Sequence, residues 1–116
     1  MQINIKGIQL EITPSLQFYI EQKFGPLTRF IKKFDEEGVI EFDLQVMRTT
    51  KHHHKGSIYR AQAHLRLPKK VVHIASENYD IRAAIDVLKD KLRIALEKYK
   101  EMEIMPEREL RGGRKK

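Results

Sequence analysis

Three consecutive histidines, His52 to His54, are the residues of this 116-residue chain whose type and spacing most suggest chemistry. They lie between Lys51 and Lys55, and imidazoles bind metals, transfer protons or, when protonated, contact anions. Adjacent side chains of an extended segment point to opposite sides, so three neighbouring imidazoles do not converge readily on one ion. Zinc also requires about four ligands, and the nearest carboxylates in sequence are Asp43 and Glu77. We therefore predict no metal site.

The histidines fall within a stretch that carries only positive charge. No Asp or Glu occurs from Leu44 to Ser76, and all five histidines lie there. The stretch has seven cations, which equals the formal net charge of +7: Arg48, Lys51, Lys55, Arg60, Arg66, Lys69 and Lys70. A pI near 9.7 with clustered charge indicates a polyanionic partner, above all nucleic acid. We interpret Lys51, His54 and Lys55 as a hairpin tip that contacts RNA; a solvated loop without a partner is the alternative.

Other catalytic groups are sparse in the sequence. The chain has no cysteine, so it has no thiol nucleophile and no thiolate metal site. Its serines lack the G-x-S-x-G context, and Gly112–Gly113 precede no helix that could hold a phosphate. The sequence therefore predicts neither an enzyme nor a cofactor. A hydrolase whose histidines bind a metal ion ranks third, after two hypotheses in which the protein binds RNA.

Length and hydropathy restrict the class of protein. A chain of 116 residues is the size of one domain. No segment approaches the roughly 18 apolar residues that cross a bilayer, and the first residues alternate instead of forming an apolar run. We expect a cytoplasmic protein, monomeric in isolation, with no membrane or small-molecule partner.

The order of secondary structure follows from the apolar periodicity. Alternation predicts strands at 2–6, 39–48, 58–67 and 71–75. A first helix should begin with Thr13 as N-cap and Pro14 at the first helical position, kink near Gln22–Pro26, and end at Gly38. A last helix should run from near Tyr79 to about Glu101. Residues 102–116 are predicted to be a basic, disordered tail behind a domain at 1–101.

The apolar faces predict how these elements pack. Each strand has one apolar face; in 39–48 it is Ile40, Phe42, Leu44 and Val46, and in 58–67 it is Tyr59, Ala61, Ala63, Leu65 and Leu67. The helix stripes are Leu16, Ile20, Leu27, Ile31 and Phe34, then Ile81, Ile85, Leu88, Leu92, Ala95 and Tyr99. The predicted fold is an α+β, two-layer β-α-β-β-β-α domain. Its four-stranded mixed sheet has the first two strands parallel and both helices on one face.

The cations of the two helices are the predicted RNA-binding residues. In the last helix, Arg82, Lys89, Arg93 and Lys100 lie along one flank of the apolar stripe and Lys91 and Lys98 along the other, while the acids mostly occupy the outermost face. The first helix adds Lys23 and Arg29, with Lys32 and Lys33 beyond them. We expect these charges to line a groove between the helices that contacts a phosphate backbone. Salt bridges along the helices are the alternative.

Two motifs resemble a known family. "LEITPSL" (10–16), then "DIRAAIDVLKDKL" (80–92) with "KYK" (98–100), are similar in order and spacing to the ribosome hibernation promoting factor family, also called protein Y or sigma-54 modulation protein. The resemblance covers residues 1 to about 101. It implies the β-α-β-β-β-α fold, reminiscent of double-stranded-RNA-binding domains.

The resemblance also implies a function. Family members bind the small ribosomal subunit and its rRNA in the channel of mRNA and tRNA, and stabilise inactive ribosomes under stress. The family's basic positions correspond to Lys23, Lys91 and Lys98. The chain differs from the family pattern at two places. Position 82 is Arg where the family usually has Tyr, and positions 93–94 are Arg-Ile where the family often has Arg at the second of the two. Long members add a domain that pairs ribosomes; we expect none here. A general RNA-binding module or RNA chaperone is the alternative.

Overall fold

A computed structural model describes residues 3–33, 40–49 and 58–104 of the chain. Its elements follow the predicted order, with β1 at Ile3–Ile8, α1 at Pro14–Lys32, β2 at Glu41–Thr49, β3 at Ile58–Leu67, β4 at Lys70–Asn78 and α2 at Ile81–Ile104. β4 is longer than the predicted strand at 71–75, and α2 extends three residues past the predicted end at Glu101. The tail predicted after it lies mostly outside the described residues.

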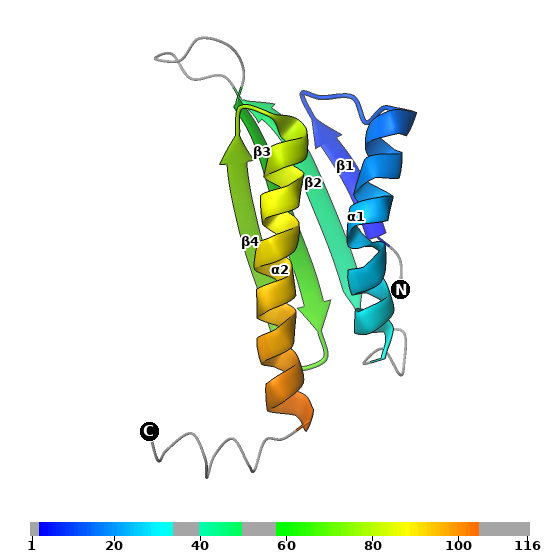
Figure 1. Cartoon of the computed structure of the whole chain (residues 1–116), viewed down its shortest axis with the longest axis vertical. Helices are drawn as coiled ribbons and strands as arrows, with labels where there is room; N and C mark the ends of the chain where they lie inside the picture. Colours follow the sequence, from blue (N-terminus) through cyan, green and yellow to red (C-terminus); the bar gives the residue numbers. More distant parts are fainter. Residues whose placement is uncertain (1–2, 34–39, 50–57, 105–116) are drawn as a thin grey trace.

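The four strands form one mixed sheet in the order β1-β2-β3-β4. β1 runs parallel to β2, and the other two pairs are antiparallel. Both helices cover the same face of this sheet, with α1 over β1 and β2 and α2 over β3 and β4 (Figure 1). The predicted two-layer α+β fold is therefore confirmed.

The start of α1 is fixed by its capping residues. Thr13 is the N-cap, and its hydroxyl oxygen accepts a hydrogen bond of 3.2 Å from the backbone N–H of Leu16. Pro14 occupies the first turn, where its missing N–H costs nothing. Pro26 lies inside the helix, which continues to Lys32, and the Thr28 hydroxyl donates to the Gly25 carbonyl nearby at 2.7 Å. The helix is therefore continuous through Pro26, where a kink was expected. It ends at Lys32 with Lys33 as its C-cap, so the predicted end at Gly38, outside the described residues, was too late.

The connection from β1 to α1 is a tight turn. Gln9 adopts a left-handed conformation with φ of 54°. The returning chain passes so close to Gly7 that a Cβ there would lie 2.2 Å from the carbonyl oxygen of Leu10. Only glycine accommodates this approach, which brings the chain from the end of β1 to the N-cap of α1.

The core lies between the sheet and the helices, as the apolar faces predict. The predicted stripes are buried at Leu16, Ile20, Leu27 and Ile31 in α1, and at Ile85, Leu88, Leu92 and Tyr99 in α2. Three further buried residues were absent from the predicted stripes: Phe24, Ala84 and Leu96. Phe24 packs edge-on against Phe42 with ring centroids 5.8 Å apart. Tyr59, predicted to be in the core, is only half-buried, and Phe34 lies outside the described residues.

The start of α2 is fixed by Asp80, one residue after the predicted start near Tyr79. Its carboxylate accepts from the backbone N–H of Arg82 at 3.1 Å, and its carbonyl accepts from that of Ala84 at 3.0 Å. Asp80 is therefore the N-cap, and its negative charge lies at the favourable end of the helix dipole. Among the described residues, neither helix has the length and apolarity that a bilayer crossing needs.

Candidate nucleic-acid interface

The outer surface of the helical layer is built around the seam between α1 and α2. The two helices run side by side in the same direction (Figure 1). Side chains from both meet along it, with Arg82 donating to Ser15 at one end and the Lys100 ammonium over the Phe30 ring at 5.7 Å at the other. We call this line of contacts, from Ser15 and Arg82 to Phe30 and Lys100, the interhelical seam.

A tyrosine and a carboxylate hold the middle of the interhelical seam. The hydroxyl of Tyr19 donates to Oδ1 of Asp86 at 2.6 Å, and the ammonium of Lys23 lies 3.3 Å from the same oxygen. The hydrogen bond to Asp86, followed by burial, raises the pKa of Tyr19 above its ordinary value. The same carboxylate raises the pKa of Lys23. Asp86 therefore keeps both groups protonated and joins the helices.

The position of Asp86 corrects one expectation. The acids of the last helix were predicted to lie mostly on its outermost face, away from the neighbouring helix. Asp86 instead faces α1, because a position four residues after Arg82 lies on the flank that the seam occupies. Lys23 is therefore locally compensated, and its charge is shared with a carboxylate.

Arg82 is held in place by two contacts with α1. Its guanidinium donates to the Ser15 hydroxyl at 3.1 Å and lies 5.0 Å from the centre of the Tyr19 ring. A cation over an aromatic ring is attracted by the ring's electron-rich face. Arg82 stays exposed at the surface, so its charge is oriented by the protein and remains accessible to a ligand.

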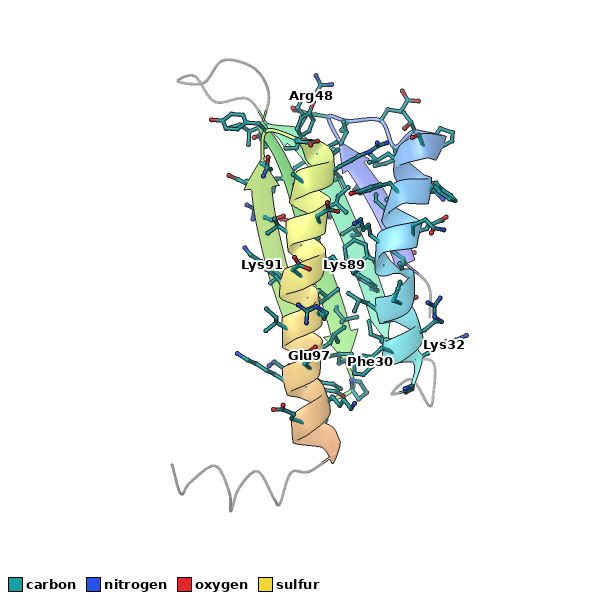
Figure 2. All side chains as sticks on the ribbon, viewed as in Figure 1. Phe30, Lys32, Arg48, Lys89, Lys91 and Glu97 are labelled. Carbon is teal, nitrogen blue, oxygen red and sulfur yellow. The ribbon has the colours of Figure 1, made fainter. Side chains whose placement is uncertain are left out.

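The remaining cations of this flank differ in their surroundings. Lys89 lies on the side of α2 that faces α1 (Figure 2). Arg93 pairs with Glu97 at 3.1 Å along the helix, so the salt-bridge interpretation holds for this residue. Lys100 is oriented by the Phe30 ring. The predicted flank of four cations is therefore present, but one of them is compensated within its own helix.

Lys91 and Lys98 lie on the opposite flank of α2. The ammonium of Lys91 donates to the backbone carbonyl of Ala75, in edge strand β4, at 2.9 Å. Figure 2 shows Lys91 and Lys89 on opposite sides of the helix. The expectation that Lys91 lines a groove between the helices was therefore wrong, because this flank of α2 borders β4 and not α1. The cations form two rows on either side of α2.

Most of these cations pair with no carboxylate of the part of the chain that the structure describes. Among the residues that the structure describes, no carboxylate pairs with Lys89, Lys91 or Lys98. The same holds for Arg29 and Lys100. Uncompensated ammonium and guanidinium groups on an exposed surface are the groups that phosphate oxygens attract.

The histidine-rich part of the site is only partly described. Lys51, His54 and Lys55 lie outside the described residues. His64 and His73 are cross-strand partners on β3 and β4, with ring centroids 5.7 Å apart. Within the described ranges, no group of three or more His, Cys, Asp or Glu is placed to hold a metal ion.

Sequence reasoning missed Ser15 and Tyr19 as members of the surface. Tyr19 precedes Lys23 by four residues, which places both on one face of α1. That spacing was the available signal. It could not show that Asp86, 67 residues further along the chain, lies opposite.

Comparison with known proteins agrees with the fold and the motifs. The ribosome hibernation promoting factor of Klebsiella oxytoca is 33% identical over 101 residues, covering 87% of this chain and 95% of that protein. The protein of the same name from Azotobacter vinelandii is 34% identical over 104 residues, covering 90% of this chain and 87% of that protein.

Solved structures give the same result for the architecture. The N-terminal domain of Thermus thermophilus Protein Y matches with a TM-score of 0.58 and 26% identity, over 85% of this chain and 99% of that one. A ribosomal subunit interface protein from Coxiella burnetii shares the fold, with a TM-score of 0.60, 22% identity, and coverage of 86% and 98%. The family model described as sigma 54 modulation protein / S30EA ribosomal protein matches residues 3–103. This chain therefore belongs to the sigma 54 modulation protein / S30EA ribosomal protein family.

Proposed function

We propose that this chain is a ribosome hibernation factor that binds the small ribosomal subunit through its helical layer. The single observation that carries the proposal is the pair of cation rows on α2. In these rows Lys91 and Lys98 are exposed, Lys89 is half-buried, and none has a carboxylate partner among the described residues. The names of the relatives, ribosome hibernation promoting factors, support the same partner.

The contact we propose is with the rRNA backbone. Phosphate contacts depend on charge and position and do not require base edges, which suits ammonium groups on a rigid helix. Arg82 and Lys100 are oriented by aromatic rings of α1, so less side-chain entropy is lost when they bind. The proposed site comprises Lys23, Arg29, Arg82, Lys89, Lys91, Arg93, Lys98 and Lys100, with Lys51, His54 and Lys55 as a second contact.

We further propose that binding occurs in the channel used by mRNA and tRNA, and that the protein acts by occupancy, without catalysis. An occupied channel excludes the ligands of translation, so the ribosome is kept inactive and intact. The domain at 1–101 would supply this binding as a monomer. The basic tail at 102–116 would add long-range attraction to the polyanion.

Cosedimentation tests the proposal against its alternative, a general RNA-binding module. The protein should pellet with purified small subunits more tightly than with naked rRNA at the same salt concentration. Subunits already loaded with mRNA and tRNA should bind less of it, because the channel is occupied. Equal affinity for subunits and naked rRNA would favour the general RNA-binding module, and undiminished binding to loaded subunits would contradict the channel.

A further inference from the structure

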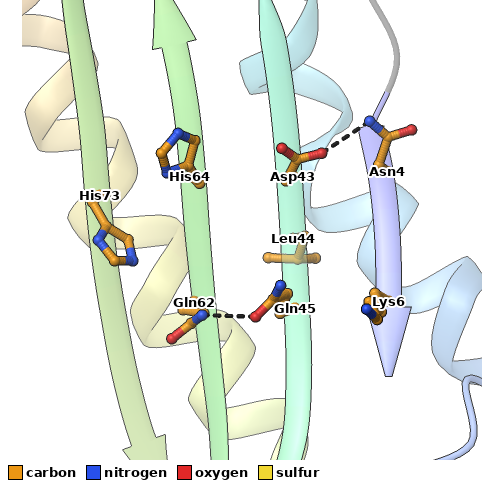
Figure 3. A pocket seen from close by; sticks show the side chains of 8 residues that line it. All are labelled: Asn4, Lys6, Asp43, Leu44, Gln45, Gln62, His64 and His73. Carbon is orange, nitrogen blue, oxygen red and sulfur yellow. Dashed lines mark hydrogen bonds between the residues drawn. The ribbon is translucent and has the colours of Figure 1, made fainter. Parts of the chain in front are cut away.

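The sheet carries a polar hollow on the face away from the helices. Its volume is about 470 Å³, and Figure 3 shows its lining with the helices behind the sheet. On β2, Asp43 alternates with buried neighbours and so points outward. The strand register places Asn4, Asp43, His64 and His73 in one row across all four strands. The hollow thus presents a carboxylate, an amide and two imidazoles side by side.

The charge of this face differs from that of the helical layer. Alternation along the described strands places three cations and three carboxylates on it: Lys6, Arg60, Arg66, Glu41, Asp43 and Glu77. Arg60 pairs with Glu77 at 3.2 Å, and the Arg66 guanidinium lies 3.6 Å from Glu41. A balanced face does not attract a phosphate backbone. A ligand of this hollow must be recognised by hydrogen bonds and ring contacts.

Hydrogen bonds within the hollow fix the direction of its amides. Arg60 donates to the Gln62 side-chain oxygen at 3.1 Å, and the Gln62 nitrogen donates to the Gln45 oxygen at 2.7 Å. This chain of bonds leaves the NH₂ group of Gln45 as its outward donor. Asn4 donates to one oxygen of Asp43 at 2.9 Å, which leaves the other oxygen as an acceptor. Among the described residues, no other group takes that donor or that acceptor.

The donor and the acceptor come from the same face of one strand. Asp43 and Gln45 lie two residues apart on the same face of β2, which is about 7 Å along a strand. A nucleobase edge that has a carbonyl oxygen next to an N–H group can bond to both residues: its oxygen accepts from the Gln45 amide, and its N–H donates to the Asp43 carboxylate. Guanine and uracil have that order, whereas adenine and cytosine have an amino group next to a ring acceptor. Guanine adds a second N–H donor toward the carboxylate.

The imidazoles provide a surface for the face of the base. The rings of His64 and His73 are tilted by 59° with centroids 5.7 Å apart, too close for a base to insert between them. His64 is half-buried and is the partner of Asp43 on the neighbouring strand, so a base whose edge pairs with Asp43 lies beside this ring. Histidine is one of the side chains on which unpaired RNA bases stack.

We propose that this hollow binds an unpaired guanine of single-stranded RNA. Its carbonyl oxygen accepts from Gln45, its N–H groups donate to Asp43, and its ring stacks on His64. The site is on the opposite face of the sheet from the helices and does not depend on the proposed rRNA contact. It would let the protein hold a single strand while its helical layer is engaged elsewhere.

The test uses NMR titration of the whole protein with two pentaribonucleotides, one of adenines only and one with a central guanine. Amide signals of β2, β3 and β4 on this face should shift with the guanine-containing strand, and that strand should bind about tenfold more tightly. Gln45→Ala and Asp43→Asn should each remove the preference. The matched controls Gln17→Ala and Asp90→Asn, on the helices, should retain it.

Two results would overturn the proposal. Equal affinity for the two strands would show that no base edge is read. Shifts confined to the helices, with an unchanged guanine preference in the Asp43 and Gln45 variants, would place any base recognition elsewhere. Small-subunit binding is measured in parallel with the same variants. Because these variants leave the helical cations intact, loss of guanine preference with retained subunit binding separates this site from the proposed function.

Discussion

The phenolic oxygen of Tyr19 lies 2.6 Å from Oδ1 of Asp86, and this hydrogen bond joins α1 to α2 across 67 residues of sequence. The same carboxylate pairs with Lys23, and Arg82 lies over the Tyr19 ring. One acid thus orients a tyrosine and a lysine of the other helix. The surface that we propose for RNA is therefore organised before any RNA binds.

Replacing Tyr19 with Phe should lower the free energy of unfolding by about 1 kcal/mol, because a partly buried hydrogen bond to a charged acceptor is lost. Urea denaturation measures the change. The same replacement in an Asp86→Ala background should cost much less, since the acceptor is already absent. An equal loss in both backgrounds would show that the hydroxyl does not act through Asp86.

Alkaline titration should reveal a late-titrating tyrosine. The hydrogen bond to Asp86 raises the pKa of Tyr19 above its ordinary value of 10.0, so the folded state holds this proton more tightly than the unfolded state. The resulting stability is fully present below pH 10 and is lost as the pH rises through the folded pKa. Tyrosinate absorbance measures it. Tyr19→Phe should delete the late component, and Asp86→Ala should shift it to lower pH; an unchanged titration in Asp86→Ala would contradict this cause.

Reversing charge on the β4 side of α2 should abolish ribosome binding. Lys91 and Lys98 have no carboxylate partner in the described part of the chain, so Lys91→Glu with Lys98→Glu places repulsion where we propose phosphates. Cosedimentation measures binding, and circular dichroism checks the fold. The matched control, Lys69→Glu with Lys70→Glu, changes the net charge equally at the turn between β3 and β4. Comparable losses from both pairs would indicate that only net charge matters.

Salt dependence should distinguish a compensated cation from a free one. Each phosphate contact contributes roughly 0.7 to 0.9 to the slope of log affinity against log salt concentration. Lys89→Gln should reduce the slope by about that amount. Arg93→Gln should reduce it less, because Glu97 already balances Arg93 at 3.1 Å. The assignment fails if the Arg93 variant loses more slope than the Lys89 variant.

Deleting residues 106–116 should weaken binding only by about 1–2 kcal/mol, as expected for a few screened charges. We propose that these residues attract a polyanion at long range without making specific contacts. Binding at two salt concentrations measures the loss, which should shrink at the higher one. If this deletion abolishes binding while the Lys91 and Lys98 reversal does not, the tail is the RNA anchor.

The sequence alone was sufficient for the elements and their order. Thr13 and Pro14 mark a helix start through capping groups that act within one turn. Phe42, Leu44 and Val46 alternate at the strand period, and all three are buried. These signals are local, so no knowledge of distant contacts was needed. The two motifs at 10–16 and 80–92 likewise identified the family.

What only the tertiary structure decided is which neighbour lies on each side of a residue. The helical period shows that Lys91 flanks the buried stripe, but not that β4 borders that flank and offers it the Ala75 carbonyl. Phe24, four residues after Ile20, lies on the stripe that the helical period predicts, but only the structure shows that it packs against Phe42. The Tyr19–Asp86 hydrogen bond depends on how the two helices pack, and the row from Asn4 to His73 depends on the strand register. The periodicity of a sequence gives the direction of a side chain within its own helix or strand, but it does not show which other element packs against that side chain.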